Sequence, residues 1–148
     1  DLGVPGENST YCQGSRYFAK NLPIPRPDEA INLDMVGDKQ LVLPIERYSL
    51  EYHPKLVRYL WDRARDMGLD AFIGRVDYAI YDDHVPLHEI AGIPAINLID
   101  FKYPNPYANF WHTMNDIPEN CSAESLGQVG ALMVDYIYNR EGQNWGEK

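Results

Sequence analysis

Two stretches of the chain place apolar residues at helical spacing. Between Pro54 and Gly68, apolar side chains recur every three or four residues, with proline in the first helical turn and glycine as the stop. A second helix is predicted after Ser122, a good N-cap residue, with an apolar stripe of Leu126, Val129, Leu132, Met133, Tyr136 and Ile137. Shorter helices are expected over residues 15–20 and 86–91.

Short apolar runs between turn-forming residues predict strands. Residues 30–36 form such a run before a glycine, and residues 93–99 form another with Pro94 near its start. Weaker strand patterns cover residues 41–43 and 71–81. Because strands and helices alternate along the chain, the sequence predicts an α/β fold in which helices pack on the faces of a sheet.

Composition indicates one acidic globular domain. The 148 residues include 13 Lys and Arg against 22 Asp and Glu, a formal net charge of −9. This charge repels phosphate backbones and anionic lipid headgroups, so we expect no nucleic-acid partner and no membrane partner. No apolar run approaches the length that spans a bilayer. Two cysteines, Cys12 and Cys121, are too few for a disulfide scaffold.

Acidic residues gather where ligands bind in α/β folds, at the carboxyl ends of strands. Asp34 comes near the end of one predicted strand, and Asp82 and Asp83 follow another. A carboxylate beside a buried run is costly unless it is paired, hydrogen-bonded or bound to a metal. Asp82-Asp83-His84 suits metal ligation, support of a ligand histidine, or a proton relay. The structural alternatives are a capping role for Asp34 and a solvated turn at residues 82–84.

One histidine lies in the predicted loop over residues 101–121. His112 directly follows Trp111, and several other aromatic residues nearby favour a site shielded from solvent. A histidine at the protein surface is the structural alternative. By themselves, the residues predict an acidic α/β domain with a carboxylate and histidine cluster, and they leave zinc binding open.

Four segments together resemble one protein family. They are Ile31-Asn32-Leu33-Asp34-Met35-Val36-Gly37, Asp82-Asp83-His84-Val85-Pro86, Gly92-Ile93-Pro94-Ala95, and Phe110-Trp111-His112-Thr113-Met114-Asn115-Asp116 with Glu119-Asn120. In this order and spacing they are similar to the zinc-dependent exopeptidases that include the bacterial double-zinc aminopeptidases and the glutaminyl-peptide cyclotransferases.

This resemblance implies a fold, a cofactor and a site. The fold is a three-layer α/β sandwich, in which a mixed, mostly parallel sheet has helices on both faces and holds one or two zinc ions at its strand ends. The metal ligands implied are Asp1, Asp34 and His112, and aspartate at position 1 replaces the more usual glutamate. Asp34 binds the second zinc in the aminopeptidase pattern, or takes part in the proton network in the pattern of the single-zinc cyclases. The resemblance also assigns Asp82, Asp83 and Trp111 to the catalytic site with Asp34. It implies a secreted or periplasmic enzyme that acts on peptide N-termini.

The chain also departs from the pattern of this family. A His-x-Asp segment that supplies a ligand and the metal-bridging aspartate has no counterpart, and the glutamate general base would immediately precede Asp1. Residues 1–148 are therefore expected to form the C-terminal part of one catalytic domain and to be inactive alone. An apolar sheet edge at residues 30–36 and 94–100 is expected to be covered by the missing N-terminal half or by self-association.

Three functional classes remain open after this comparison, two of them enzymatic. Asp82 and Trp111 resemble the cyclotransferase pattern, whereas Asn97 stands where animal cyclases carry a pocket histidine. An aminopeptidase is the second enzymatic possibility. A non-catalytic scaffold or binding module of the same fold is the alternative from another class, although retention of Asp34 and His112 argues against it.

Overall fold

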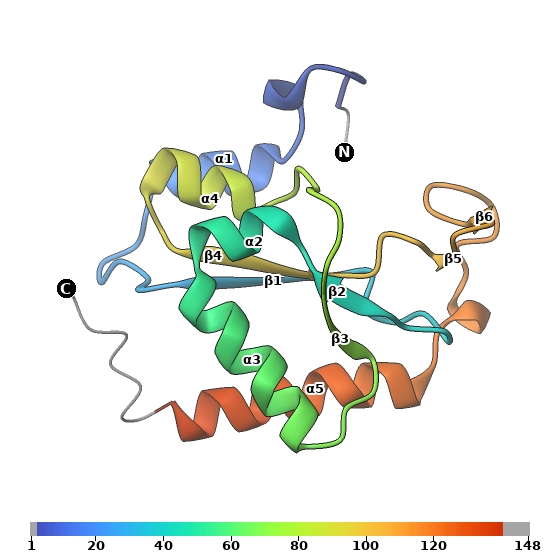
Figure 1. Cartoon of the computed structure of the whole chain (residues 1–148). Helices are drawn as coiled ribbons and strands as arrows, with labels where there is room; N and C mark the ends of the chain where they lie inside the picture. The colour runs from blue at the N-terminus through green and yellow to red at the C-terminus, as the bar shows by residue number, and fades with distance from the viewer. Residues whose placement is uncertain (1–2, 141–148) are drawn as a thin grey trace.

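The computed structural model describes residues 3–140, which form small sheets covered by helices (Figure 1). Two of the sheets are parallel pairs and the third is an antiparallel hairpin. The strands are β1 (Ala30–Asp34) paired with β4 (Ala95–Ile99), β2 (Leu43–Ile45) paired with β3 (Phe72–Val76), and β5 (Pro104–Asn105) paired with β6 (Ala108–Asn109). Parallel pairs joined through helices confirm the predicted α/β class.

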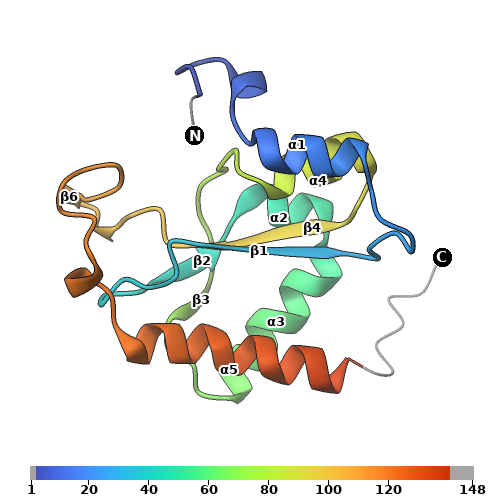
Figure 2. The ribbon, with the colours of Figure 1, turned by 180° about the vertical axis from the view of Figure 1, so that it is seen from behind.

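Helices lie on both sides of the β1–β4 pair. In both views, α1 and α4 lie on one side, whereas α3 and α5 lie on the other (Figures 1 and 2). Their bounds are α1 (Gln13–Lys20), α2 (Arg47–Tyr52), α3 (Pro54–Asp66), α4 (His84–Ala91) and α5 (Ala123–Asn139). This arrangement confirms the predicted three layers, with sheets that are incomplete.

The core lies between the strands and the layer formed by α3 and α5. Leu56, Leu60, Ile96, Leu98 and Leu132 are fully buried in it. Trp61 of α3 fixes this layer to the second sheet, because its indole Nε1 donates to the carbonyl oxygens of Leu43 and Ile73 at 3.2 and 3.0 Å. These apolar contacts hold the strand ends, and therefore the residues that follow them, in place.

The two strands of the first sheet differ in burial. All five residues of β4 are buried, whereas β1 is half-buried and Leu33 is 46% exposed. Within residues 3–140, β1 pairs only with β4. Both segments were predicted to form an open edge, and β1 has the more accessible side chains of the two. The side chains of β4 are covered, in part because α2 and α4 pack against β4.

Several predicted boundaries differ from the structure. The strand expected at residues 41–43 lies at Leu43–Ile45, and the helix expected to begin at residue 15 begins at Gln13. In α5, Val129, Leu132 and Tyr136 are buried as expected, but Leu126 and Ile137 are 50% and 67% exposed. The apolar stripe is wider than the face that α5 packs against the described part of the chain.

The short helix α2 and the β5–β6 hairpin were not predicted. Helix α2 has only six residues, and its N-cap is a glutamate, which is not among the common N-cap residues. The hairpin has two residues in each strand, too few for an alternating pattern. Among the residues described, no helix combines the length and the apolar character needed to cross a membrane.

Candidate functional site

Asp34 ends β1 and concentrates negative charge with its neighbours. Burial raises the pKa of Asp34, and the charges of Asp82 and Asp83 raise this pKa further. The backbone amide of Met35 and the side chain of His112 act in the opposite direction on the pKa of Asp34. Asp34 therefore interacts electrostatically with the Asp82-Asp83 pair and with His112, although these residues come from three separate segments.

Asp82 is held in place by two asparagines of the first sheet. Its Oδ2 accepts from Nδ2 of Asn32 and from Nδ2 of Asn97, both at 2.8 Å, and Asn32 also donates to Oδ1 of Asn97 at 3.1 Å. Asn32 and Asn97 are directly opposite each other in the β1–β4 register, which explains how both reach one carboxylate oxygen. The other oxygen, Oδ1, accepts from the backbone amide of Asp83 at 2.7 Å. Asp82 is thus fixed by charge-assisted hydrogen bonds.

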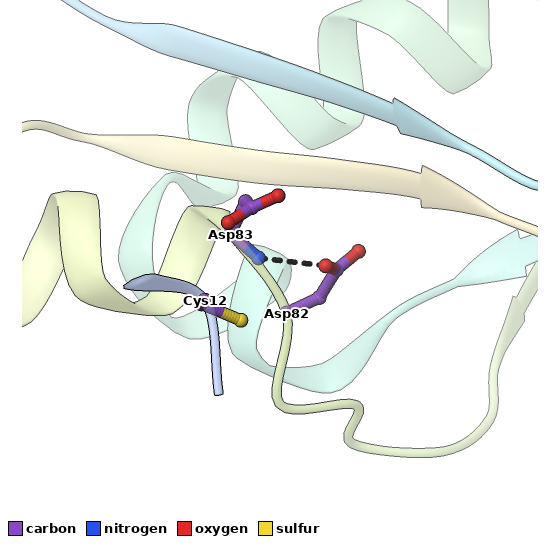
Figure 3. Close-up of side chains that lie close together, drawn as sticks. All are labelled: Cys12, Asp82 and Asp83. Carbon is purple, nitrogen blue, oxygen red and sulfur yellow. Dashed lines mark hydrogen bonds between the residues drawn. The ribbon is translucent and has the colours of Figure 1, made fainter. Parts of the chain in front are cut away.

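A cysteine that the sequence did not point to lies beside the two aspartates. Ligand atoms of Cys12, Asp82 and Asp83 all lie within 4.8 Å of one another (Figure 3). Burial raises the pKa of the Cys12 thiol to about 12, and the charges of Asp83 and Asp82 contribute to this rise. Because metals bind the thiolate, a thiol that stays protonated at neutral pH is a poor ligand. Cys12 forms part of the wall of the site.

His112 and Trp111 lie in the loop that follows β6. Both are exposed, and their rings stack with centroids 4.1 Å apart. Trp111 also contacts Phe101, with ring centroids 5.3 Å apart. A cavity of about 80 Å³ opens beside Trp111, and its wall includes Met35 and Tyr103. The predicted aromatic neighbours of His112 are therefore present, but Trp111 and His112 are not shielded from solvent by the described residues, as the surface alternative expects.

Three non-glycine residues near this site have a left-handed backbone conformation. Among residues 3–140, the non-glycine residues with positive φ are Cys12 at 55°, Met35 at 53° and His112 at 57°. Met35 directly follows Asp34, and Cys12 lies beside Asp82. Left-handed backbone at such residues costs on the order of 1–3 kcal/mol each and is typical of active sites and ligand clamps. Strain at three points around one cluster indicates a functional site.

Two further histidines of the described chain, His84 and His88, have partners of their own. Asp1 is outside the described residues. His84 is fully buried and its Nε2 lies 3.2 Å from Oε2 of Glu46. His88 stacks on Tyr52, with ring centroids 3.8 Å apart. Neither histidine belongs to the cluster around Asp34.

The donor set around Asp34 fits a zinc ion. A half-buried carboxylate and an accessible imidazole supply the oxygen and nitrogen ligands that zinc takes in proteins. The negative charge that raises the pKa of Asp34 would be neutralised by a cation at this position. Asp34 and His112 supply these two kinds of ligand, and Cys12, Asp82 and Asp83 form a separate group of possible ligand atoms.

The chain is similar to known enzymes. Glutaminyl-peptide cyclotransferase of Boiga dendrophila is 30% identical to the chain, over 84% of the chain and 38% of that protein. Aminopeptidase YwaD of Bacillus subtilis (strain 168) is 31% identical, over 84% of the chain and 28% of the relative. Both relatives are named as enzymes that act on peptides.

Solved structures show the same fold. Porphyromonas gingivalis glutaminyl cyclase matches with a TM-score of 0.87 and 32% identity, over 95% of this chain and 52% of that one. A zinc-dependent exopeptidase from Parabacteroides distasonis matches with a TM-score of 0.83 and 32% identity, over 95% of this chain and 50% of that one. The chain therefore spans about half the length of these solved relatives.

The family comparison covers nearly all of the described residues. The model of Peptidase family M28 matches residues 3–137, which include Asp34, the Asp82-Asp83 pair and His112. Together with the relatives and the shared fold, this match extends the resemblance seen in the four sequence segments to residues 3–137. The chain belongs to peptidase family M28.

Proposed function

We propose that this chain forms part of a zinc-dependent enzyme that acts on the N-terminal residue of peptides. The observation that carries the proposal is that Asp34 interacts electrostatically with His112 and with Asp82, whose carboxylate is fixed by Asn32 and Asn97. Membership of family M28 and the zinc-dependent exopeptidase among the structural relatives support zinc as the metal.

The roles of the described residues follow from their positions. Asp34 and His112 would hold the zinc ion, and Asp1 is proposed as a further ligand from the family resemblance alone. When bound, zinc supplies a Lewis acid that polarises the substrate carbonyl. Asp82 accepts hydrogen bonds from Asn32, Asn97 and the backbone amide of Asp83, which hold it in place, and it would take a proton from the substrate. Asp83, next to it, would take part in the same proton network.

Cyclisation of N-terminal glutamine is the reaction that the site favours. In such a reaction the substrate amine attacks its own side-chain amide, so water must be kept away from the reacting atoms. Trp111 stacks on His112, contacts Phe101 and lines the adjoining cavity, so its ring would shield one side of a small substrate side chain bound there. The glutaminyl cyclase among the structural relatives supports this choice.

Hydrolysis by an aminopeptidase is the second candidate. Asn97 favours it, because this residue binds Asp82 at a position where animal cyclases carry a histidine. The aminopeptidase among the relatives supports the same reading. The two reactions place opposite demands on the site, since hydrolysis must admit water.

We further propose that residues 1–148 are inactive alone. The general base that the family resemblance implies is not among these residues, and the accessible edge of β1 offers a surface for the other half of the domain. Catalysis requires the base, the metal and the substrate pocket in one place.

One experiment separates the two candidate reactions, cyclisation and hydrolysis. The full-length protein is assayed with peptides that begin with glutamine, for release of ammonia, and with leucine p-nitroanilide, for release of nitroaniline, before and after removal of zinc. Zinc-dependent ammonia release from the glutaminyl peptides is the expected result. Nitroaniline release alone would select the aminopeptidase, and no zinc-dependent turnover of either substrate would overturn the proposed function.

A further inference from the structure

A fully buried acidic residue, Glu46, lies behind the site and has no role in the chemistry described above. Its side chain is 0% exposed and accepts five hydrogen bonds. Oε1 accepts from the backbone amides of Tyr48 and Ile80 at 2.9 and 3.0 Å. Oε2 accepts from the amide and hydroxyl of Ser49 at 2.7 and 2.8 Å and lies 3.2 Å from Nε2 of His84.

These contacts make Glu46 an ionised group inside the protein. Burial by itself would raise the pKa of Glu46, but the hydrogen bonds from His84 and from the amides of Tyr48, Ser49 and Ile80 outweigh burial, and the pKa lies below its usual range. A buried carboxylate with every partner in place is rigid, and it is costly to disturb because loss of one partner leaves a buried charge without compensation.

The first connection from Glu46 to the site runs through the chain itself. Ile80 and His84 stand on either side of residues 81–83, and Glu46 binds the backbone of one and the ring of the other. Both ends of the short segment that carries Asp82 and Asp83 are therefore attached to one carboxylate. In the ring of His84, Nδ1 has no hydrogen-bond partner among the described residues, so the contact with Glu46 is the one that orients it.

The second connection runs through Ser49 and Asn97. The hydroxyl of Ser49 donates to Glu46 and accepts from the backbone amide of Asn97 at 2.8 Å. The side chain of Asn97 in turn donates to Oδ2 of Asp82 at 2.8 Å. Glu46 thus acts on Asp82 from two directions, through its own segment and through the asparagine that binds it.

A second pair of a histidine and a glutamate has the same separation, but its partners among the described residues do not connect it to Asp82. Nε2 of His53 lies 3.2 Å from Oε2 of Glu29, the same separation as in the pair formed by His84 and Glu46, and the two side chains are 10% and 5% exposed. The other oxygen of Glu29 contacts the hydroxyl of Tyr136 and Nη2 of Arg140, which lie at the C-terminal end of α5 and just beyond it. Glu29 is therefore a buried acid of the same kind whose partners are not those of Asp82.

We propose that Glu46 is a positioning residue that fixes Asp82 for its part in the reaction. The geometric part of this inference stands on the hydrogen bonds above, whereas the catalytic part rests on the proposed function. Residues that hold a metal ligand in place typically change activity by about 10–100-fold when they are replaced, and we expect an effect of this order for Glu46. Substitution of Glu46 by glutamine supplies an amide nitrogen where one of the two carboxylate oxygens now accepts, so one set of contacts must break.

The geometric part is tested by NMR of the full-length protein. The side-chain amide signals of Asn32 and Asn97 report where Asp82 lies, because both amides donate to its Oδ2. We expect Glu46→Gln to shift both signals and Glu29→Gln to leave them in place. Should Glu46→Gln fail to fold, Ser49→Ala cuts only the branch through Asn97 and should shift the Asn97 signal. Unchanged signals in every folded variant would overturn the inference.

The catalytic part is tested by a double-mutant cycle on turnover. We expect Glu46→Gln to lower kcat by 10–100-fold with little change in KM, and to have no further effect in a protein that already carries Asp82→Asn. An equal loss of kcat in Glu29→Gln, or additive losses in the double variant, would refute positioning through Asp82. If Asp82→Asn leaves activity intact while Glu46→Gln still shifts the amide signals, the proposed function fails and the positioning of Asp82 stands.

Discussion

Asn97 offers the most direct measure of how strongly the first sheet holds Asp82. Its side chain is fully buried, donates to Oδ2 of Asp82 at 2.8 Å and accepts from Nδ2 of Asn32 at 3.1 Å. Asn97→Ala removes both hydrogen bonds and leaves the backbone of β4 unchanged. The exposed Asn139 makes a bond of equal length, 2.8 Å, to Oδ1 of Asp135, so Asn139→Ala is a matched control.

The expected loss follows from the two bonds. A hydrogen bond to a charged group contributes about 1.5–3 kcal/mol and a neutral bond about 0.5–1.5 kcal/mol. Asp82 is half-buried and keeps its bond from Asn32, so the lower part of the combined range applies. We expect the free energy of unfolding to fall by about 2–3 kcal/mol in Asn97→Ala and by no more than about 0.5 kcal/mol in Asn139→Ala.

Urea unfolding of the full-length protein measures both changes. A lower midpoint with an unchanged m value shows that stability, and not the extent of unfolding, has changed. The reasoning is refuted if Asn97→Ala loses no more stability than Asn139→Ala, because Asp82 would then be held by other contacts.

Four further outcomes are expected. Asp34→Asn should weaken zinc binding by more than the 10–100-fold that outer contacts contribute, as measured by competition with a chelator; retained affinity would exclude Asp34 as a ligand. Zinc removal should lower the thermal midpoint of the full-length protein, since a ligand of the folded state stabilises it; an unchanged midpoint would contradict a zinc site in this fold. The pKa of Glu46 is lower in the folded than in the unfolded state, so its contribution to stability is present above the unfolded pKa and is lost as pH falls through the folded value. In urea titrations, the stability difference between wild type and Glu46→Gln should therefore shrink on acidification. A pH-independent difference would argue against a buried charge. In sedimentation experiments, the isolated 148-residue chain should self-associate through the edge of β1, where Leu33 is exposed. Leu33→Lys should reduce this association. A monomer with a cooperative melting transition would mean that these residues form a self-sufficient fold.

Local patterns predicted the elements that depend on local spacing. Helices α3 and α5 and strands β1 and β4 were found from periodicity and turn residues because each is long enough, or apolar enough, to leave a pattern. Helix α2 was missed since its start depends on Glu46, whose burial comes from partners elsewhere in the chain.

The residues of the site also fall into those that local sequence patterns predict and those that depend on contacts between distant segments. Asp34 could be found because it follows an apolar run, and Asp82 because it adjoins a second acid. The contact between Asn32 and Asn97 could not be found, because these residues are separated by 65 positions and meet only through the β1–β4 register. Cys12 was missed because its position beside Asp82 depends on where α1 packs, which no local spacing reveals.

The central claim is that Asp34 and His112 hold zinc beside the fixed carboxylate of Asp82. A crystal of the full-length protein measured on both sides of the zinc absorption edge tests it most directly. We expect an anomalous peak about 2 Å from a carboxylate oxygen of Asp34 and from a ring nitrogen of His112, the distances at which zinc binds these ligands. A zinc peak held by other residues, with both Asp34 and His112 beyond contact with it, would contradict the claim.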